Sequence, residues 1–168
     1  MILYVLALLL GIAVIGLDQL TKYIIMHNFA LGEGCDFIKG IIDIQYIHNR
    51  GAAWGILSGK TWILLIFTVT VMALCLVLLL KTFKGSRIML FAMTLVISGG
   101  IGNLYDRIFR DGNVVDFLHF EFWPDFPIFN IADCAICIGA GLLILYLLIE
   151  TVKEYKNKKE TKPENGSN

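Results

Sequence analysis

The chain has 168 residues, of which 57% are hydrophobic, and its formal net charge is zero. A soluble domain is rarely this apolar, and the apolar residues occur in long blocks, so the composition excludes an ordinary soluble globular protein. No nucleic-acid partner is expected. We predict an all-α membrane protein with four transmembrane helices. Residues 1–155 form one integral-membrane domain in this prediction, and residues 156–168 form a disordered cytoplasmic tail.

The first predicted span covers about residues 2–24 and is expected to be retained as a helix. It lacks the basic N-terminal region and the clear small-residue cleavage site of a signal peptide. The apolar block also runs into Asp18-Gln19-Leu20-Thr21-Lys22, which continues the helix. Asp18 and Lys22 have the i, i+4 spacing of an ordinary helical ion pair, and we interpret them first in that way.

The first outer loop, at about residues 27–59, contains an alternating segment. Residues 42–48 alternate between apolar and polar side chains, as a half-buried strand does. Asn49-Arg50-Gly51 is typical of a turn, and residues 52–57 fit either a return strand or an interfacial segment. We therefore predict a small sheet that rests on the membrane.

The remaining spans are predicted at about residues 60–80, 88–106 and 131–152. The second outer loop, at about residues 107–129, carries an aromatic, strand-like segment that ends at two prolines. Asn130 is a favourable N-cap for the fourth helix. The extracytoplasmic loops are thus expected to be small and rich in strands.

The distribution of basic residues predicts the orientation of the spans. Three basic residues lie in the short link at 81–87, and five lysines lie between residues 153 and 162. The positive-inside rule then places the link and both termini in the cytoplasm. Three spans consequently have polar residues in the outer leaflet, where we expect one site formed by Asp18, Asn103, Asp106, Arg107, Asn130 and Asp133, with Asp116 in the loop above them.

Asp116 and Asp133 are candidates for an acid/base pair that activates water, because ionised carboxylates near hydrocarbon are costly. Other interpretations remain open. Asn130 and Asp133 have capping-box spacing, so Asp133 can be interpreted as a helix cap. Asp116 can be interpreted as a loop carboxylate that faces water. Arg107, next to Asp106, fits an ion-pair network between helix ends at least as well as a direct catalytic role.

Cys134-x-x-Cys137 is the motif of a competing function, that of a four-helix membrane thiol oxidoreductase. We favour small apolar residues in helix packing, because the motif lies inside a predicted helix. A proton-relaying transporter subunit is a third possibility, but a relay requires carboxylates spread through the depth of the membrane. His27, His48 and His119 lack the spacing of zinc ligands, so no metal site is predicted.

Five blocks of the chain resemble the bacterial lipoprotein signal peptidases, also called signal peptidase II. The blocks are Asp18-Gln19-Leu20-Thr21-Lys22, Asn49-Arg50-Gly51-Ala52-Ala53-Trp54-Gly55, Gly102-Asn103-Leu104-Tyr105-Asp106-Arg107, Val114-Val115-Asp116-Phe117 and Phe129-Asn130-Ile131-Ala132-Asp133. Each block is moderately specific, and the five in this order on four spans are very specific. The resemblance covers nearly the whole chain apart from the tail.

The resemblance implies an intramembrane aspartic endopeptidase of the bacterial cytoplasmic (inner) membrane, with its active site near the outer leaflet. Such an enzyme removes the signal peptide from diacylglyceryl-modified prolipoproteins by cleaving before the lipidated cysteine. The resemblance makes Asp116 and Asp133 the catalytic dyad. It implies supporting or substrate-binding roles for Asp18, Lys22, Asn49, Gly51, Asn103, Asp106, Arg107 and Asn130. No cofactor is implied, and membrane lipids and globomycin-type inhibitors are the other expected partners.

Overall fold

Long helices and one small sheet make up the computed structural model, which describes residues 1–81 and 86–160. The elements in chain order are α1 (Ile2–Asn28), β1 (Gly34–Ile38), β2 (Ile42–Asn49), the 3-10 turn η1 (Ala53–Gly55), α2 (Thr61–Lys81), α3 (Arg87–Phe109), β3 (Val114–Phe120) and α4 (Ile131–Glu160). The predicted fold class is confirmed: four helices in the described residues are long and apolar enough to span a membrane.

The helices carry their apolar side chains outward, as a protein in lipid does. On α1 the buried residues are Ala7, Asp18, Lys22 and Ile25, whereas most of its leucines are exposed. A charged residue that is buried inside the bundle avoids hydrocarbon but requires partners there. The polar side chains of the helices therefore mark where the protein builds its own interior.

Helix α3 is the central helix of the bundle, and it packs against α1, α2 and α4. Small residues permit this close packing. A Cβ added at Gly102 would lie 2.6 Å from Oδ2 of Asp18, and a Cβ added at Gly139 would lie 2.7 Å from the carbonyl oxygen of Ala92. Gly102 and Gly139 thus set the approach of α1 and α4 to α3.

The three strands form one antiparallel sheet in the order β1-β2-β3, and both outer loops contribute to it. The strand predicted in each outer loop is confirmed, but the pairing of β2 with β3 joins segments about 70 residues apart, which local periodicity does not indicate. Ile25 of α1 packs with Tyr46, Val115 and Phe117 and fixes the sheet to the end of the bundle. The segment after β2 is a 3-10 turn and not a return strand.

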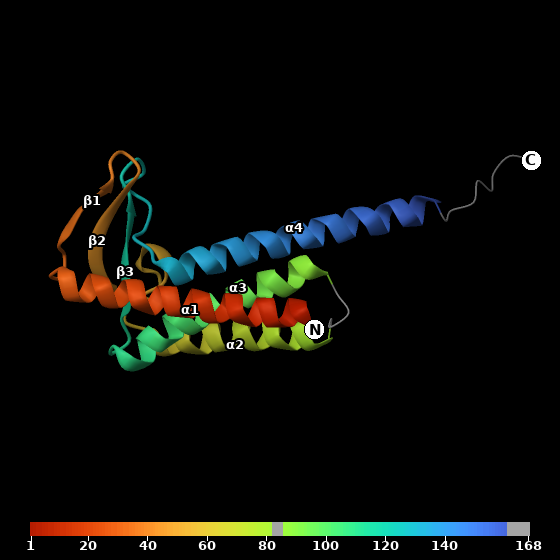
Figure 1. Ribbon diagram of the computed structural model, residues 1–168, viewed down its shortest axis with the longest axis horizontal. Helices are drawn as coiled ribbons and strands as arrows, with labels where there is room; N and C mark the ends of the chain where they lie inside the picture. The colour runs from red at the N-terminus through yellow and green to blue at the C-terminus, as the bar shows by residue number, and fades with distance from the viewer. Residues whose placement is uncertain (82–85, 161–168) are drawn as a thin grey trace, which may run out of the picture.

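Figure 1 shows the sheet lying across one end of the helices. The N-terminus, the end of α2 and the start of α3 all lie at the opposite end of the bundle, and α4 continues beyond them (Figure 1). Because α4 is helical to Glu160, the predicted disorder is wrong for residues 156–160. The rest of the predicted tail, residues 161–168, lies outside the described residues.

Candidate active site

A buried cluster of charges joins α1 to α3 just below the sheet. The side chains of Asp18, Lys22 and Asp106 are fully buried. The ammonium group of Lys22 lies 2.8 Å from a carboxylate oxygen of Asp18 and 2.9 Å from one of Asp106. The i, i+4 pair predicted on α1 therefore forms, but it is not an ordinary pair, because the same lysine also neutralises a carboxylate of another helix.

Two further side chains complete this cluster, and sequence reasoning missed both. Arg110 forms an ion pair with Asp106, four residues earlier on the chain. The amide of Gln19 donates to Asp18 at 3.0 Å and to Asp106 at 3.1 Å, and its oxygen accepts from Arg110. The i, i+4 spacing of Asp106 and Arg110 was an available signal. The role of Gln19 has no comparable local pattern.

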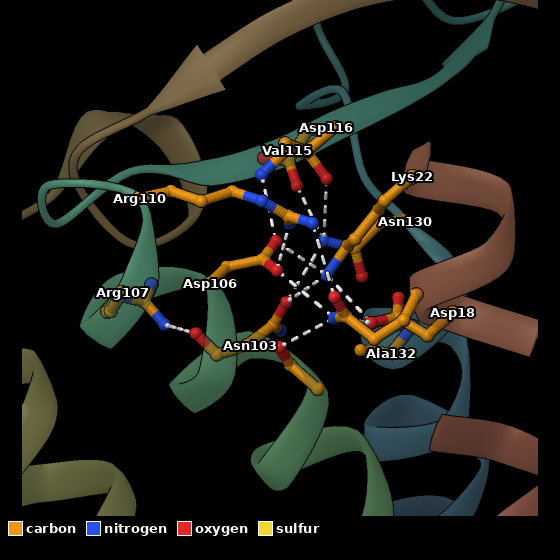
Figure 2. A network of polar contacts seen from close by, with 12 residues as sticks. Asp18, Lys22, Asn103, Asp106, Arg107, Arg110, Val115, Asp116, Asn130 and Ala132 are labelled. Carbon is orange, nitrogen blue, oxygen red and sulfur yellow. Dashed lines mark hydrogen bonds and ion pairs between the residues drawn. The ribbon is translucent and has the colours of Figure 1, made fainter. Parts of the chain in front are cut away.

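The same carboxylates hold the two segments that carry Asp116 and Asp133. Asp106 accepts a hydrogen bond from the backbone N–H of Val115 on β3, at 3.1 Å. Asp18 accepts from the backbone N–H of Ala132 in the first turn of α4, at 2.9 Å. The charge cluster thus fixes the residue immediately before each candidate catalytic aspartate, as Figure 2 shows.

Two asparagines connect the charge cluster to the candidate dyad. Oδ1 of Asn103 accepts from Lys22 at 3.2 Å and from the amide of Asn130 at 3.1 Å. Because the Asn103 oxygen accepts these two bonds, the NH₂ group of the same side chain points to Asp133 and donates to it at 2.7 Å. The Asn130 amide donates to Asp116 at 2.6 Å. Lys22 therefore orients a chain of amides that ends on both carboxylates, and Figure 2 shows its branch through Asn130 to Asp116.

Asp116 is almost fully buried, with 1% of its surface exposed, so it is not a loop carboxylate that faces water. Its second oxygen accepts a hydrogen bond from the amide of Asn49 at 2.9 Å. Burial, followed by the nearby carboxylate of Asp133, raises the pKa of Asp116 to about 7, although the hydrogen bonds from Asn49 and Asn130 act in the opposite direction.

Asp133 lies in the first turn of α4 and forms the capping box expected from its spacing with Asn130. The Asp133 N–H donates to the Asn130 side chain at 2.9 Å, and the Asn130 N–H donates back to the Asp133 carboxylate at 3.2 Å. Capping does not exclude a chemical role, because one oxygen of Asp133 serves the cap and the other accepts from Asn103. Asn130 contacts both aspartates and so holds them near each other.

The turn after β2 closes over the site from the sheet side. The side chain of Asn49 accepts from the N–H of Gly51 at 2.8 Å, which fixes the amide that donates to Asp116. The carbonyl of Gly51 accepts from Arg107 at 3.1 Å. A side chain at Gly51 would lie 2.9 Å from the carbonyl oxygen of Ile56, so a glycine is needed for this turn to fold back. Arg107 fastens the turn to α3 and is not ion-paired with its neighbour Asp106.

A cavity of about 630 Å³ opens in front of the two aspartates. Its polar lining includes Asn49, Asn103, Arg107, Asp116 and Asp133, and the rest is mainly apolar: Trp54, Phe120, Phe126, Pro127, Ile128, Phe129, Ile136 and Ile138. A cavity with a few converging polar groups on an apolar wall is the usual form of a binding site for an organic ligand. Among residues 1–81 and 86–160, no group of three potential His, Cys, Asp or Glu ligands is arranged to hold a metal ion.

The two cysteines of α4 also line this cavity. Both are free thiols; Cys134 is half-buried and Cys137 is exposed. The face of α4 that packs against α3 carries Ala132 and Gly139. The interpretation of the motif as a helix-packing pair is therefore wrong for Cys137.

Comparison with known proteins gives concordant matches. Residues 10–149 match the family model Peptidase_A8, described as signal peptidase (SPase) II. The lipoprotein signal peptidase of Halothermothrix orenii is 44% identical over 134 residues, which cover 80% of this chain and 89% of that protein.

Two solved structures of bacterial membrane enzymes, both determined by the in meso method, have a similar fold. The one at 2.3 Å resolution is 34% identical, with a TM-score of 0.79 and coverage of 96% of this chain and 94% of that chain. The one at 1.9 Å resolution is 38% identical, with a TM-score of 0.77 and coverage of 84% and 92%.

Proposed function

The chain belongs to the signal peptidase II family, and from this premise we propose that it is an aspartic endopeptidase in which Asp116 and Asp133 are the catalytic dyad. Family membership makes it a bacterial membrane peptidase that processes prolipoproteins. The finer proposal is that it cleaves the peptide bond before a cysteine that already carries diacylglycerol, and so releases the signal peptide.

One observation carries this proposal. A buried and a half-buried carboxyl group, those of Asp116 and Asp133, line one largely apolar cavity, and both are held by the same residue, Asn130. Two carboxylates in such a place do not both ionise readily, so they share a proton. A pKa of Asp116 near 7 is consistent with a singly protonated pair at neutral pH.

A singly protonated pair supplies both groups that hydrolysis of a peptide bond requires. The ionised carboxylate takes a proton from a water molecule, and the resulting hydroxyl attacks the scissile carbonyl. The protonated carboxyl donates a hydrogen bond to the carbonyl oxygen, where negative charge develops. When the tetrahedral intermediate collapses, a proton passes to the leaving nitrogen. No covalent enzyme intermediate forms in this scheme.

The other polar residues of the site position these two groups and the substrate. Asn103 and Asn130 aim their amides at the dyad, and Asp18, Lys22 and Asp106 hold those amides in place. Asn49, Gly51 and Arg107 form the rim of the cavity next to Asp116. The apolar remainder of the cavity suits the acyl chains and the apolar signal peptide, and we expect globomycin-type inhibitors to occupy the same space.

The proposed orientation places the sheet and the dyad at the outer face of the cytoplasmic membrane, with both termini in the cytoplasm. The sheet lies at one end of the bundle, and the basic residues Arg87, Lys153 and Lys156 belong to helix segments near the other end (Figure 1). The positive-inside rule assigns that second end to the cytoplasm. A prolipoprotein signal peptide then spans the same membrane beside α4 and reaches the dyad with its C-terminal end.

The test is cleavage by the purified full-length chain in lipid nanodiscs. The substrate is a lipobox peptide that carries diacylglycerol on its cysteine, and mass spectrometry identifies the products. We expect one cut, directly before the modified cysteine. The matched control is the same peptide with an unmodified cysteine, which should be cleaved far more slowly. A cut elsewhere, or equal rates for both peptides, would remove the proposed specificity.

A further inference from the structure

Beyond the candidate active site, the sheet ends in a group of exposed apolar side chains that the proposed reaction does not use. Residues 37–42 and 120–123 form this end, which we call the sheet tip, and Ile42 pairs with Phe120 across it. Its most exposed apolar side chains are each at least 46% exposed: Phe37, Ile38, Ile41, Phe122 and Trp123. A contiguous apolar surface of this kind marks a place where a protein meets another molecule or a membrane.

Strand pairing divides the sheet tip into an apolar face and a polar face. Residues that lie directly opposite each other on neighbouring strands share one face of a sheet. Two rows cross the three strands in this way, an apolar row and a polar row: Ile38, Ile42 and Phe120, and Asp36, Asp43 and His119. Because Ile42 and Asp43 are neighbours on β2, the two rows lie on opposite faces. Phe120 lines the cavity, so the apolar row is on the cavity side of the sheet.

The cavity side of the sheet is also the side on which the bilayer lies. Ile136 and Ile138 of the membrane span α4 line the same cavity as Phe120. Phe129, two residues before α4 begins, pairs with Leu118 of β3, so the sheet is fixed at the level where α4 leaves the membrane. Figure 1 shows the hairpin of β1 and β2 projecting sideways past α4, near the level at which α4 begins. The apolar row of the tip therefore overhangs lipid.

Trp123 has the chemistry of a side chain at a membrane–water interface. Its ring is 52% exposed and packs on the ring of Phe126, with 5.1 Å between the centroids. No hydrogen bond among residues 1–81 and 86–160 uses its indole N–H, whereas the N–H of Trp54 donates to the carbonyl of Asp125 at 3.3 Å. Tryptophan is enriched at bilayer interfaces because its apolar body enters the lipid while its N–H meets polar groups.

The tip and the cavity wall share one cluster of aromatic rings. The ring of Phe120 lies 5.1 Å from that of Phe122 and 5.2 Å from that of Phe126. Phe126 in turn packs against Phe129 at 5.7 Å, and Phe120, Phe126 and Phe129 all line the cavity. The exposed rings of the tip are thus in contact with the rings that form the wall, so an anchor at the tip also holds the wall in place.

We propose that the sheet tip is a lipid-binding surface, whose apolar row and Trp123 insert into the interface of the bilayer that the helices span. The polar row stays in water on the other face. The ligand is the phospholipid layer beside α4: its uppermost acyl carbons contact Ile38 and Ile42, and its carbonyl or phosphate oxygens accept from the Trp123 N–H. A bilayer surface accounts both for the one-sided apolar row and for the level of the tip, because lipid lies on that side.

The depth of Trp123 in a bilayer tests this proposal. The full-length variant Trp54→Phe/Trp62→Phe keeps Trp123 as its one tryptophan and is placed in phosphatidylcholine nanodiscs with one chain in each. Its fluorescence is quenched either by lipid brominated in the acyl chains or by acrylamide from the water. The reference variant, Trp54→Phe/Trp123→Phe, keeps Trp62, which lies at the start of α2 and is 65% exposed. We expect brominated lipid to quench Trp123 as strongly as it quenches Trp62.

A matched pair of charge substitutions in the Trp123 protein tests which face meets the lipid. Ile38→Asp adds a carboxylate to the apolar row. Gln45→Asp adds the same charge to the polar face, because Gln45 is exposed and lies two residues after Asp43 on β2. Ile38→Asp should lose most of the quenching by brominated lipid, since a charge at that position is costly in lipid. Gln45→Asp should keep it. Thermal unfolding checks that both variants are folded.

Three outcomes would overturn the proposal. If acrylamide quenches Trp123 and brominated lipid does not, the tip lies in water. If neither quencher reaches Trp123, protein and not lipid covers the tip. If Ile38→Asp and Gln45→Asp lose lipid quenching equally, the apolar row does not face the bilayer. The measurement needs no substrate, so its result stands whether or not the protein cleaves a diacylglyceryl peptide.

Discussion

Two pairs of aspartates lie in the same site and are held in opposite ways, and all four are buried except Asp133, which is half-buried. Asp18 and Asp106 are paired with cations: Lys22 lies within 2.9 Å of both, and Arg110 also pairs with Asp106. Two negative charges are thus matched by two positive charges, and the other donors to this pair are the Gln19 amide and two backbone N–H groups. This pair has the features of a structural ion cluster, which holds segments together and does not exchange protons.

Asp116 and Asp133 receive amide and backbone N–H donors and, within the described residues, form no ion pair. Both line the cavity, whereas the carboxylates of the ion cluster do not. Neutral donors hold a carboxylate in place without a cation in direct contact, and the charges of Lys22 and Arg107 act on the pair only from a distance. The pair can therefore take up and release a proton. The comparison teaches that burial of an aspartate does not by itself indicate catalysis; the type of partner does.

The largest expected effect comes from removing either member of the second pair. Asp116→Asn and Asp133→Asn should each lower the rate of peptide cleavage by at least about 10²–10⁴-fold, because each removes one of two required proton-transfer groups. Both variants should remain folded, since Asn has the shape of Asp. The double variant should be no worse than the worse single variant, because the two groups act as a unit.

The control for this prediction is Asp36→Asn, which changes an exposed carboxyl of β1 and should cleave at the wild-type rate. Initial rates on the diacylglyceryl peptide are the measurement. An Asp116→Asn variant with more than a small residual activity would show that the pair does not act by proton transfer.

Removing the cation that Asp18 and Asp106 share should lower the thermal stability of the protein. Lys22→Met leaves Asp18 and Asp106 buried without their shared ammonium group, and breaking a buried ion pair costs about 3–5 kcal/mol. We expect a large fall in Tm, measured by thermal unfolding in detergent. Lys153→Met is the matched control, since Lys153 pairs with Glu150 on an exposed surface of α4 and its loss should leave Tm unchanged. Equal Tm values for both variants would contradict the assignment of the cluster as structural.

A smaller effect is expected where α3 packs against the ion cluster. In Gly102→Ala the new Cβ would lie 2.6 Å from Oδ2 of Asp18 and 3.2 Å from the Cβ of Ala132, so the helices must shift, at a cost of about 1–3 kcal/mol. Gly16→Ala on α1 is the control, because nothing lies within 4 Å of its new Cβ. Alanine favours the helix there by about 0.5–1 kcal/mol. Thermal unfolding of both variants measures the difference, and a destabilised Gly16→Ala with an unaffected Gly102→Ala would refute the packing argument.

The spans and the strand positions could be predicted because they depend on local patterns. The charge-free block of α2 and the alternation in β2 are visible without knowledge of their neighbours. The capping box of Asn130 and Asp133 was visible for the same reason. Local patterns do not indicate which distant segments of the chain contact each other. The pairing of β2 with β3 and the sharing of Lys22 between α1 and α3 belong to this class.

The functions of single residues were harder to predict than their positions. An i, i+4 spacing does not tell whether Asp18 and Lys22 face water or the bundle interior, and their burial reverses the ordinary interpretation. The role of Gln19 depends on the contact of α1 with α3. The location of Cys137 on the cavity wall likewise depends on which face of α4 packs against α3, which small residues on both helices decide.

The smallest expected effect concerns the proton of the second pair and tests the role of a neutral donor. Asp116 loses its proton as the pH rises through a pKa of about 7, so kcat/KM should decline above that pH. The Asn49 amide donates to Asp116 at 2.9 Å and favours the ionised carboxylate, which lowers this pKa. In Asn49→Ala the pKa of Asp116 should therefore rise, and the alkaline limb of the profile should move to higher pH by about one to two units.

Asn28→Ala, at the exposed end of α1, is the control for this prediction and should keep the wild-type profile. The measurement is kcat/KM from pH 5 to about 9 for all three proteins. An alkaline limb that moves to lower pH in Asn49→Ala would show that another group, and not Asp116, carries the shared proton.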